Sequence, residues 1–442
     1  MITKDKPVPK PMFYILCCIG VLISALAPMR SSAGRLVTFD DAQRHGLERV
    51  WFAQVSVDLT QSRVSHWRLH EDQLFALSTS GTLQSLNAET GETRWTVRVG
   101  TPNGAITSPS VNDRFVAIVG GTRLYVIDSA DGHVLWSRQL GSVVTCAPAL
   151  SDTHVFVGLM NGQVEAYSLE DPAAPVWRHQ SVGRIFHSPV VGGGIVSWAT
   201  NRGFLYVAEN ERPRVMYRVE INDEIVAPPA ELSPNIYVST GNGYLYCLDE
   251  LSGAEHWRIS TGFPILRKPA IVGETVYVAS DQPALHAVSS PTGQELWFVD
   301  GAAQFVSEAA QHIYAMESLG TLLILDKQSG GVVGRLKAGE GTTALENDQS
   351  DRIFLVDDRG LVQCLRERDA LEPTYYRRQV DENQEAVEEE ASKSPFTEDP
   401  SDESVPPPVA EEEPADDFGD QFQPAEQDSE DDKTEEDGGF FF

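Results

Sequence analysis

Residues 236–257 read IYVSTGNGYLYCLDELSGAEHW, and residues 276–297 read VYVASDQPALHAVSSPTGQELW. Both stretches hold two runs of alternating apolar residues, the pattern that half-buried β-strands show. The second run ends in an aspartate or a serine, which is followed by a glycine and then by a tryptophan. Because glycine adopts positive φ without steric cost, each stretch predicts a strand hairpin, a tight turn and a third strand that carries the tryptophan.

The same arrangement recurs along the chain at a nearly constant period. An aromatic residue takes the tryptophan position at intervals of 40 or 41 residues, at Trp95, Trp136, Trp177, Tyr217, Trp257 and Trp297. A glycine lies four residues before this position in most copies, at Gly91, Gly132, Gly253, Gly293 and Gly330. A run that contains proline precedes the hairpins, with Pro109, Pro148, Pro189, Pro229 and Pro269 again about 40 apart. Each period therefore holds four short strands.

Four antiparallel strands in every 40 or so residues are typical of a propeller blade, whose faces are buried only by stacking on neighbouring blades around a ring. Counting the central strands predicts eight units, near Leu74, Phe115, Val155, Ile195, Ile236, Val276, Ile313 and Ile353. The predicted fold is therefore all-β, an eight-bladed β-propeller of four-stranded antiparallel blades over residues 49–370, with seven blades as the alternative. We expect a monomeric ring.

A propeller has to close, since an unclosed last blade would expose the edge of a strand. Residues 49–58, RVWFAQVSVD, have the outer-strand pattern with Trp51 at the aromatic position, but they belong to no complete repeat. We expect this segment to complete the blade that ends near Leu365. Residues 372–380, EPTYYRRQV, compete for the same place.

The N-terminus has the organisation of a secretory signal peptide. Residues 1–33 hold three lysines, then an apolar run of about sixteen residues, then SSA before Gly34. The run is shorter than the roughly 20 residues of a membrane span, so we expect a cleaved signal, with a retained anchor as the alternative. Residues 34–48 would form a linker with a short helix capped by Asp40 or Asp41. We expect export across the inner membrane to the periplasm or cell envelope.

Most of the charge lies at the C-terminal end. The formal net charge is −31, of which −22 falls within residues 381–442. The rest is mildly acidic without a lysine and arginine cluster, which argues against nucleic acid as a ligand. Residues 371–442 are poor in apolar residues, so we expect a disordered acidic tail. We expect its last residues, Phe440 to Phe442, to form an unstructured apolar end or, like the N-terminus, a point of membrane association.

The repeats in residues 236–257 and 276–297 resemble the PQQ-like repeat. This repeat is shared by quinoprotein alcohol and glucose dehydrogenases and by BamB, the propeller lipoprotein of the outer-membrane β-barrel assembly machinery. The resemblance covers roughly residues 49–370. In that family the recurring aromatic residue docks between neighbouring blades, and the resemblance implies this structural role for Trp51, Trp95, Trp136, Trp177, Tyr217, Trp257 and Trp297.

The enzymes of this family set a test for catalysis. The alcohol dehydrogenases hold their quinone against a disulfide of adjacent cysteines, yet the adjacent cysteines here, Cys17 and Cys18, lie in the expected signal. Cys146, Cys247 and Cys364 occupy small-residue positions of expected strands. The regular period leaves no room for long pocket-building loops, and no histidine pair has metal-ligand spacing. We therefore expect no catalytic residues, cofactor or metal, with a PQQ-dependent dehydrogenase as the least favoured alternative.

The loops that join one blade to the next face one mouth of a propeller. Two of them, SVGRIFHSPV at 181–190 and TGFPILRKPA at 261–270, carry basic residues. These four residues are Arg184, His187, Arg267 and Lys268. They predict a mouth that binds an acidic partner, for which the chain's own tail is one candidate, against the simpler interpretation of scattered solvated charges.

These patterns favour a non-catalytic scaffold that binds protein partners in the cell envelope, in outer-membrane or envelope assembly. The alternative is an extracellular module that binds a ligand or a surface polymer. The resemblance to the assembly propeller supports the first interpretation.

Overall fold

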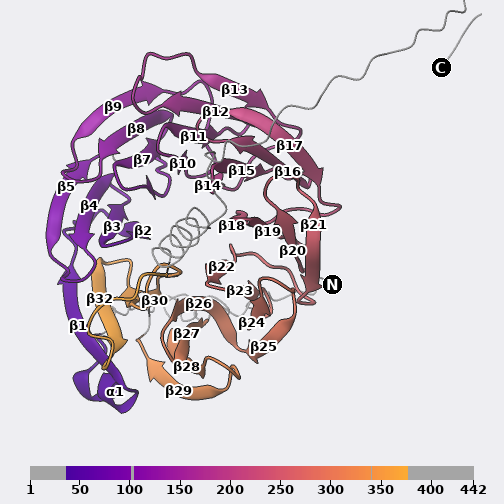
Figure 1. Cartoon of the computed structure of the whole chain (residues 1–442). Coiled ribbons are helices and arrows are strands. Elements are labelled where there is room, and N and C mark those ends of the chain that lie inside the picture. The colour runs from indigo at the N-terminus through magenta and orange to yellow at the C-terminus, as the bar shows by residue number, and fades with distance from the viewer. Residues whose placement is uncertain (1–35, 101–103, 340, 377–442) are drawn as a thin grey trace, which may run out of the picture. The chain divides into compact units, whose positions relative to one another are not determined.

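The computed structural model describes residues 36–100, 104–339 and 341–376. The chain divides into two units, residues 1–386 and 387–442, and every described residue belongs to the first. Within these ranges, eight four-stranded antiparallel sheets surround a common centre (Figure 1). The predicted eight-bladed propeller is confirmed, and the seven-bladed alternative is excluded. The expected signal peptide and almost all of the expected tail lie outside the described residues.

Seven of the blades use four consecutive strands, ordered from the centre of the ring to its rim. Blade 1 contains β2 (Val64–His70), β3 (Gln73–Ser78), β4 (Thr82–Asn87) and β5 (Thr93–Arg98). Blade 2 contains β6 (Ser110–Val111), β7 (Phe115–Gly120), β8 (Arg123–Asp128) and β9 (Val134–Gln139). Blade 3 contains β10 (Ala149–Leu150), β11 (His154–Gly158), β12 (Gln163–Ser168) and β13 (Trp177–Gln180). Blade 4 contains β14 (Val190–Gly192), β15 (Ile195–Ala199), β16 (Phe204–Glu209) and β17 (Arg214–Glu220).

The next three blades repeat the order. Blade 5 contains β18 (Ala230–Leu232), β19 (Asn235–Ser239), β20 (Tyr244–Asp249) and β21 (Glu255–Ser260). Blade 6 contains β22 (Ala270–Val272), β23 (Thr275–Ser280), β24 (Ala284–Ser289) and β25 (Glu295–Asp300). Blade 7 contains β26 (Ala302–Glu308), β27 (His312–Glu317), β28 (Thr321–Asp326) and β29 (Val332–Lys337).

Blade 8 joins the two ends of the ring. Its first three strands are β30 (Thr343–Ala344), β31 (Ile353–Val356) and β32 (Leu361–Glu367), and its outer strand is β1 (Leu47–Gln54) from the N-terminal side. Trp51 pairs with Cys364 in this sheet. The N-terminal strand therefore closes the ring, as predicted, and the competing C-terminal segment does not take that place.

A short helix, α1 (Phe39–Arg44), precedes β1. Its N-cap is Thr38, so the predicted cap at Asp40 or Asp41 is wrong. Thr38 has extended backbone angles, and its hydroxyl accepts a hydrogen bond from the Asp41 N–H at 3.2 Å. The two aspartates lie inside the first turn, where their charges favour the positive end of the helix dipole.

The apolar core lies between the blades. The described residues form eight buried hydrophobic clusters, and each draws its members from two neighbouring blades. The cluster around Trp51, for example, combines Leu74 of blade 1 with Phe354 of blade 8. A single blade therefore buries its faces only against its neighbours, and the ring is the unit of stability.

The repeated glycine and the repeated aromatic residue meet at these joints. The ring of Trp51 fills the space where a side chain at Gly91 would begin, since a Cβ there would lie 2.4 Å from Trp51 Cε3. Equivalent contacts join Gly132 to Trp95, Gly253 to Tyr217, Gly293 to Trp257 and Gly330 to Trp297. The indole N–H of Trp51 also donates to the Ala88 carbonyl at 3.0 Å. Glycine is thus required by both the turn and the close approach of the ring.

Two of the joints that have the aromatic residue depart from this pattern. The turns that face Trp136 and Trp177, at residues 170–175 and 210–213, contain no glycine. The buried indole nitrogen of Trp136 has no hydrogen-bond partner in the described structure. Trp177 instead stacks on His179, with ring centroids 6.0 Å apart, and meets the fully buried Trp198 edge-on.

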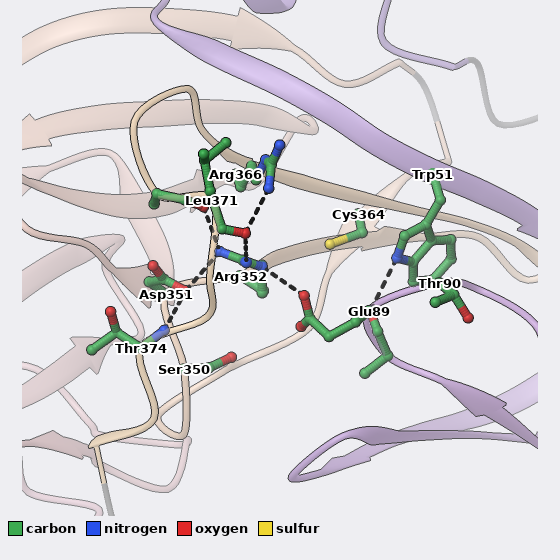
Figure 2. A network of polar contacts seen from close by, with 12 residues as sticks. Trp51, Glu89, Thr90, Ser350, Asp351, Arg352, Cys364, Arg366, Leu371 and Thr374 are labelled. Atoms are coloured by element: carbon green, nitrogen blue, oxygen red, sulfur yellow. Dashed lines mark hydrogen bonds and ion pairs between the residues drawn. The ribbon is translucent and has the colours of Figure 1, made fainter. Parts of the chain in front are cut away.

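A buried arginine fastens the closing joint (Figure 2). The side chain of Arg352 is 1% exposed and forms ion pairs with Glu89 of blade 1 at 3.1 Å and with Asp351 at 3.0 Å. Its guanidinium also donates to the carbonyls of Ala370 and Leu371, both at 3.2 Å. One side chain therefore links blade 8, blade 1 and the segment that follows β32.

That segment lies across the turn between β30 and β31. Tyr375 bridges Ser350, and the Asp351 carboxylate accepts a hydrogen bond from the Thr374 N–H at 3.2 Å. The Tyr376 N–H donates to the Gln349 carbonyl at 2.9 Å. The described part of the rival segment, residues 372–376, thus serves as a brace over blade 8. No helix among the residues placed by the structure is long and apolar enough to cross a membrane.

Candidate partner-binding face

One face of the ring, here called the mouth face, is formed by two sets of loops. These are the loops between successive blades and the turns between the second and third strands of each blade. Backbone hydrogen bonds pin one set to the other, as between the Asn201 N–H and the Arg184 carbonyl at 3.0 Å, and between the Met160 N–H and the Val143 carbonyl at 3.0 Å. The side chains on this face are therefore held by a rigid frame.

The mouth face exposes large apolar side chains. They are Leu59, Val143, Met160, Val182, Phe186, Phe263, Leu266 and Leu319. They are eight of the eighteen large apolar side chains that are exposed among the described residues, and exposed apolar groups are a feature of binding surfaces where they lie side by side. Their positions follow from the repeat: Ile185 and Ile265 are fully buried four residues before a proline, so the next residue in each loop points outward. These next residues are Phe186, 43% exposed, and Leu266, 50% exposed.

Two arginines lie beside these apolar groups in blade 4. Arg184 and Arg202 are both exposed, and neither forms an ion pair with another residue that the structure describes. The Arg202 side chain runs past Gly183, since a Cβ on Gly183 would lie 3.0 Å from Arg202 Cγ. We call the surface made by Val143, Met160, Val182, Arg184, Phe186 and Arg202 the blade 3–4 patch. It combines apolar side chains with two cations, the chemistry that protein interfaces favour.

The four predicted mouth residues fall into two pairs separated by blade 5. Arg184 and His187 belong to the loop before β14, and Arg267 and Lys268 to the loop before β22. Burial lowers the pKa of His187, against the opposing effect of the Glu224 carboxylate from the blade 5 loop. The imidazole is therefore mainly neutral near pH 7, and Arg184 is the principal cation of its pair.

The other pair lies near a carboxylate of blade 8. Burial, followed by the neighbouring Asp348 carboxylate, raises the pKa of Glu346 to about 7, and Lys268, Arg267 and Arg68 oppose this rise. Each predicted basic pair thus faces an acidic residue of another blade. The mouth is therefore a surface of mixed charge. The sequence signal for its exposed apolar residues was different: a buried isoleucine followed by an exposed residue, shortly before each proline.

Replacing Glu346 with glutamine should make the protein increasingly more stable than the wild type as the pH rises. The pKa is about 7 when folded, against an ordinary value of 4.5, so the folded state holds a proton that the unfolded state releases between these values. The free energy of unfolding of the wild type therefore falls as the pH rises through this window, because the folded state has to give up that proton. We compare the free energy of unfolding of Glu346→Gln with that of the wild type. The difference in favour of the variant should be about 1–2 kcal/mol larger at pH 8 than at pH 4. Urea midpoints at both values measure this, and a gain that does not change with pH contradicts it. Glu274→Gln, at an exposed position, is the control.

A cleft of about 320 Å³ opens beside the blade 3–4 patch. It is lined by His66 of blade 1, Thr107 of blade 2, Thr145 and Cys146 of blade 3 and Ser188 of blade 4, among others. Burial lowers the pKa of His66 and raises the pKa of the Cys146 thiol to about 12. The thiol therefore stays protonated and is a poor nucleophile.

The other two cysteines of the ring are equally inert. Cys247 in β20 and Cys364 in β32 are buried and unpaired, as the small-residue interpretation predicted. Burial raises the pKa of Cys247 to about 11 and the pKa of Cys364 further still. They serve the packing between blades.

Comparisons with known proteins agree with the fold. The family model described as outer membrane protein assembly factor BamB matches residues 34–168, 79–212 and 218–363. The BamB of Bordetella pertussis is 25% identical over 253 residues, which are 54% of this chain and 61% of that protein. The chain thus matches about three fifths of the length of this curated relative.

Solved structures share the same architecture. The crystal structure of BamB from Moraxella catarrhalis has a TM-score of 0.58 at 18% identity, covering 73% of this chain and 98% of that one. The computationally designed protein Ika8 has a TM-score of 0.57 at 16% identity, covering 69% and 96%. These two likenesses concern the fold. The family model spans well over half of the chain, and the protein belongs to the BamB family of PQQ-like β-propellers.

Proposed function

We propose that this propeller is a non-catalytic scaffold that binds protein partners during outer-membrane assembly, and that the mouth face is its binding surface. The observation that carries the proposal is the set of apolar side chains held exposed on one rigid face. Membership of the BamB family supports the assembly role. The proposal includes export to the periplasm and action as a monomeric ring.

The composition of the blade 3–4 patch suits a protein partner. Aromatic residues and arginines provide most of the binding energy in protein interfaces, and Phe186 lies two residues from Arg184. The backbone hydrogen bonds of the mouth face hold these loops in place before binding, so little conformational entropy is lost on association. The partner we infer presents apolar residues together with a carboxylate for the unpaired arginines.

The double variant Phe186→Ala/Leu266→Ala should weaken partner binding by about 30-fold or more, the effect of losing about 2 kcal/mol at an interface centre. The matched control is Leu296→Ala/Phe298→Ala on the rim strand β25, where the two side chains are 51% and 55% exposed. Envelope co-purification with mass spectrometry identifies assembly partners, and titration with the purified partner gives the affinity. If both double variants bind the purified partner with equal affinity, the binding surface is not the mouth face.

A further inference from the structure

Two buried glutamates of blade 5 meet at a turn of blade 4. Glu231 lies in β18 and is 9% exposed, and Glu250 directly follows β20 and is 6% exposed. β14 ends at Gly192, and the turn from β14 to β15 is Gly193–Gly194. A Cβ on Gly193 would lie 2.8 Å from both Glu231 Oε1 and Glu250 Oε2. The two carboxylate oxygens therefore point into the same space, no more than twice that distance apart.

The missing side chains of the turn create this space. A Cβ on Gly192 would collide with the Glu231 carboxylate, so this position also has to be glycine. Gly193, Gly194 and Ser233 beside this space are exposed, whereas the Glu250 Oε2 atom itself is buried. The glycines thus admit two carboxylates that any larger residue would exclude.

Only one of the two carboxylate oxygens of Glu250 accepts a hydrogen bond from the described part of the protein. Its Oε1 accepts a hydrogen bond from the Ser233 hydroxyl at 2.8 Å. Its Oε2 is buried and has no hydrogen-bond partner in the described part of the chain. A buried carboxylate oxygen without a donor is costly, and a second carboxylate nearby adds repulsion. Both features indicate that a cation belongs between the two groups.

Blade 7 carries an ion pair at the same two repeat positions. Glu308 pairs with Ile313 as Glu231 pairs with Ile236, and Lys327 follows the third strand of its blade as Glu250 does. In blade 7 these positions form an ion pair, with Lys327 Nζ 2.5 Å from Glu308 Oε1. Blade 5 therefore keeps the glutamate of this pair and replaces its lysine with a second carboxylate.

We propose that Glu231 and Glu250 bind a Ca²⁺ ion beside the Gly193–Gly194 turn and so join blade 4 to blade 5. The donors are all oxygens, from two carboxylates and the Ser233 hydroxyl, which is the chemistry of hard cations. No group of three or more His, Cys, Asp or Glu side chains gathers within the described ranges, so water has to complete the shell. A two-carboxylate site of this kind binds Ca²⁺ in roughly the 10⁻⁴–10⁻³ M range found in extracellular modules.

Ca²⁺ should raise the thermal midpoint of the EDTA-treated full chain by several degrees, and Mg²⁺ should do so less, because Mg²⁺ demands a tighter octahedral shell. Tb³⁺ provides a second readout by sensitised luminescence. Tyr217 lies at the site, since its hydroxyl donates to the Glu250 carbonyl at 2.6 Å. The 24 acidic residues of 381–442 also attract cations, so the measured quantity is the difference between wild type and variants.

Three variants distinguish Ca²⁺ binding at the two glutamates from Ca²⁺ binding to the acidic tail. Glu250→Gln should abolish the Ca²⁺ response and most of the Tyr217-sensitised luminescence, while Glu220→Gln, exposed on the same joint, should keep both. Glu250→Lys should recreate the blade 7 ion pair and remain stable in EDTA without responding to Ca²⁺. The proposal fails if wild type and Glu250→Gln respond equally, or if the wild type does not respond, which would mean that the two glutamates share a proton.

Discussion

Replacing Arg352 with methionine should lower the free energy of unfolding by about 3–5 kcal/mol, the cost of removing one partner from a buried ion pair. The guanidinium lies against two carboxylates, Glu89 and Asp351. Asp351 is 5% exposed, so without Arg352 its charge would remain buried and uncompensated. Methionine keeps much of the volume, which separates the loss of charge from the loss of packing. The shift of the urea midpoint at unchanged slope measures the effect.

Arg335→Met is the matched control for this prediction. Arg335 forms an ion pair with Glu317 on the surface, where its side chain is 54% exposed. Such pairs are worth at most about 1 kcal/mol. Combining Arg352→Met with Asp351→Asn should recover part of the lost stability, since the buried charge is then absent. If Arg352→Met costs no more than Arg335→Met, the network of Figure 2 does not fasten the ring.

The fold could be predicted because its evidence is local and repeated. Every blade carries the turn glycine, the outer-strand aromatic residue or both, so one hairpin pattern, counted along the chain, gives eight blades. The closing strand could be found as well, because Trp51 shows the outer-strand pattern without a repeat around it. The helix cap was missed because Thr38, Asp40 and Asp41 lie within four positions, and only the backbone angles distinguish the cap.

The brace over blade 8 could not be predicted. In the sequence Arg352 is one charged residue among many. Its partner Glu89 lies far away along the chain. Leu371 contacts it through a backbone carbonyl, which the residue type does not reveal. Burial of an arginine is a property of the closed ring, because neighbouring blades have to meet before the side chain loses contact with water.

The proposed binding surface overlaps the sequence prediction in part. Of the four basic residues predicted for the mouth, Arg184 lies in the blade 3–4 patch, whereas the exposed Phe186 and Leu266 were not among the predicted residues. Their signal is a short alternation that becomes meaningful only when Ile185 and Ile265 are known to be buried. The glutamate pair has no local signal. It is visible only when blades 5 and 7 are superimposed by their strand pairing.

Gly91→Ala should destabilise the protein by about 3–5 kcal/mol, of which only about 1–2 kcal/mol comes from the backbone. Gly91 has φ +74°, and its new methyl group would meet the Trp51 ring at 2.4 Å. Trp51 would have to leave its place against blade 1 and give up its hydrogen bond to the Ala88 carbonyl. Gly121→Ala isolates the backbone cost, because Gly121 has φ +65° and nothing within 4 Å of a Cβ.

A second comparison tests whether the loss acts on ring closure. Gly293→Ala creates the same clash, with Trp257, at the joint between blades 5 and 6. Both variants should lose similar stability, but only Gly91→Ala should release β1, because Trp51 lies on the one blade strand that comes from the N-terminal end of the ring. Hydrogen exchange of residues 47–54 measures that release. Equal protection of these residues in the two variants would mean that the joint held by Trp51 opens no more readily than the others, and that closure depends on Arg352 and the brace.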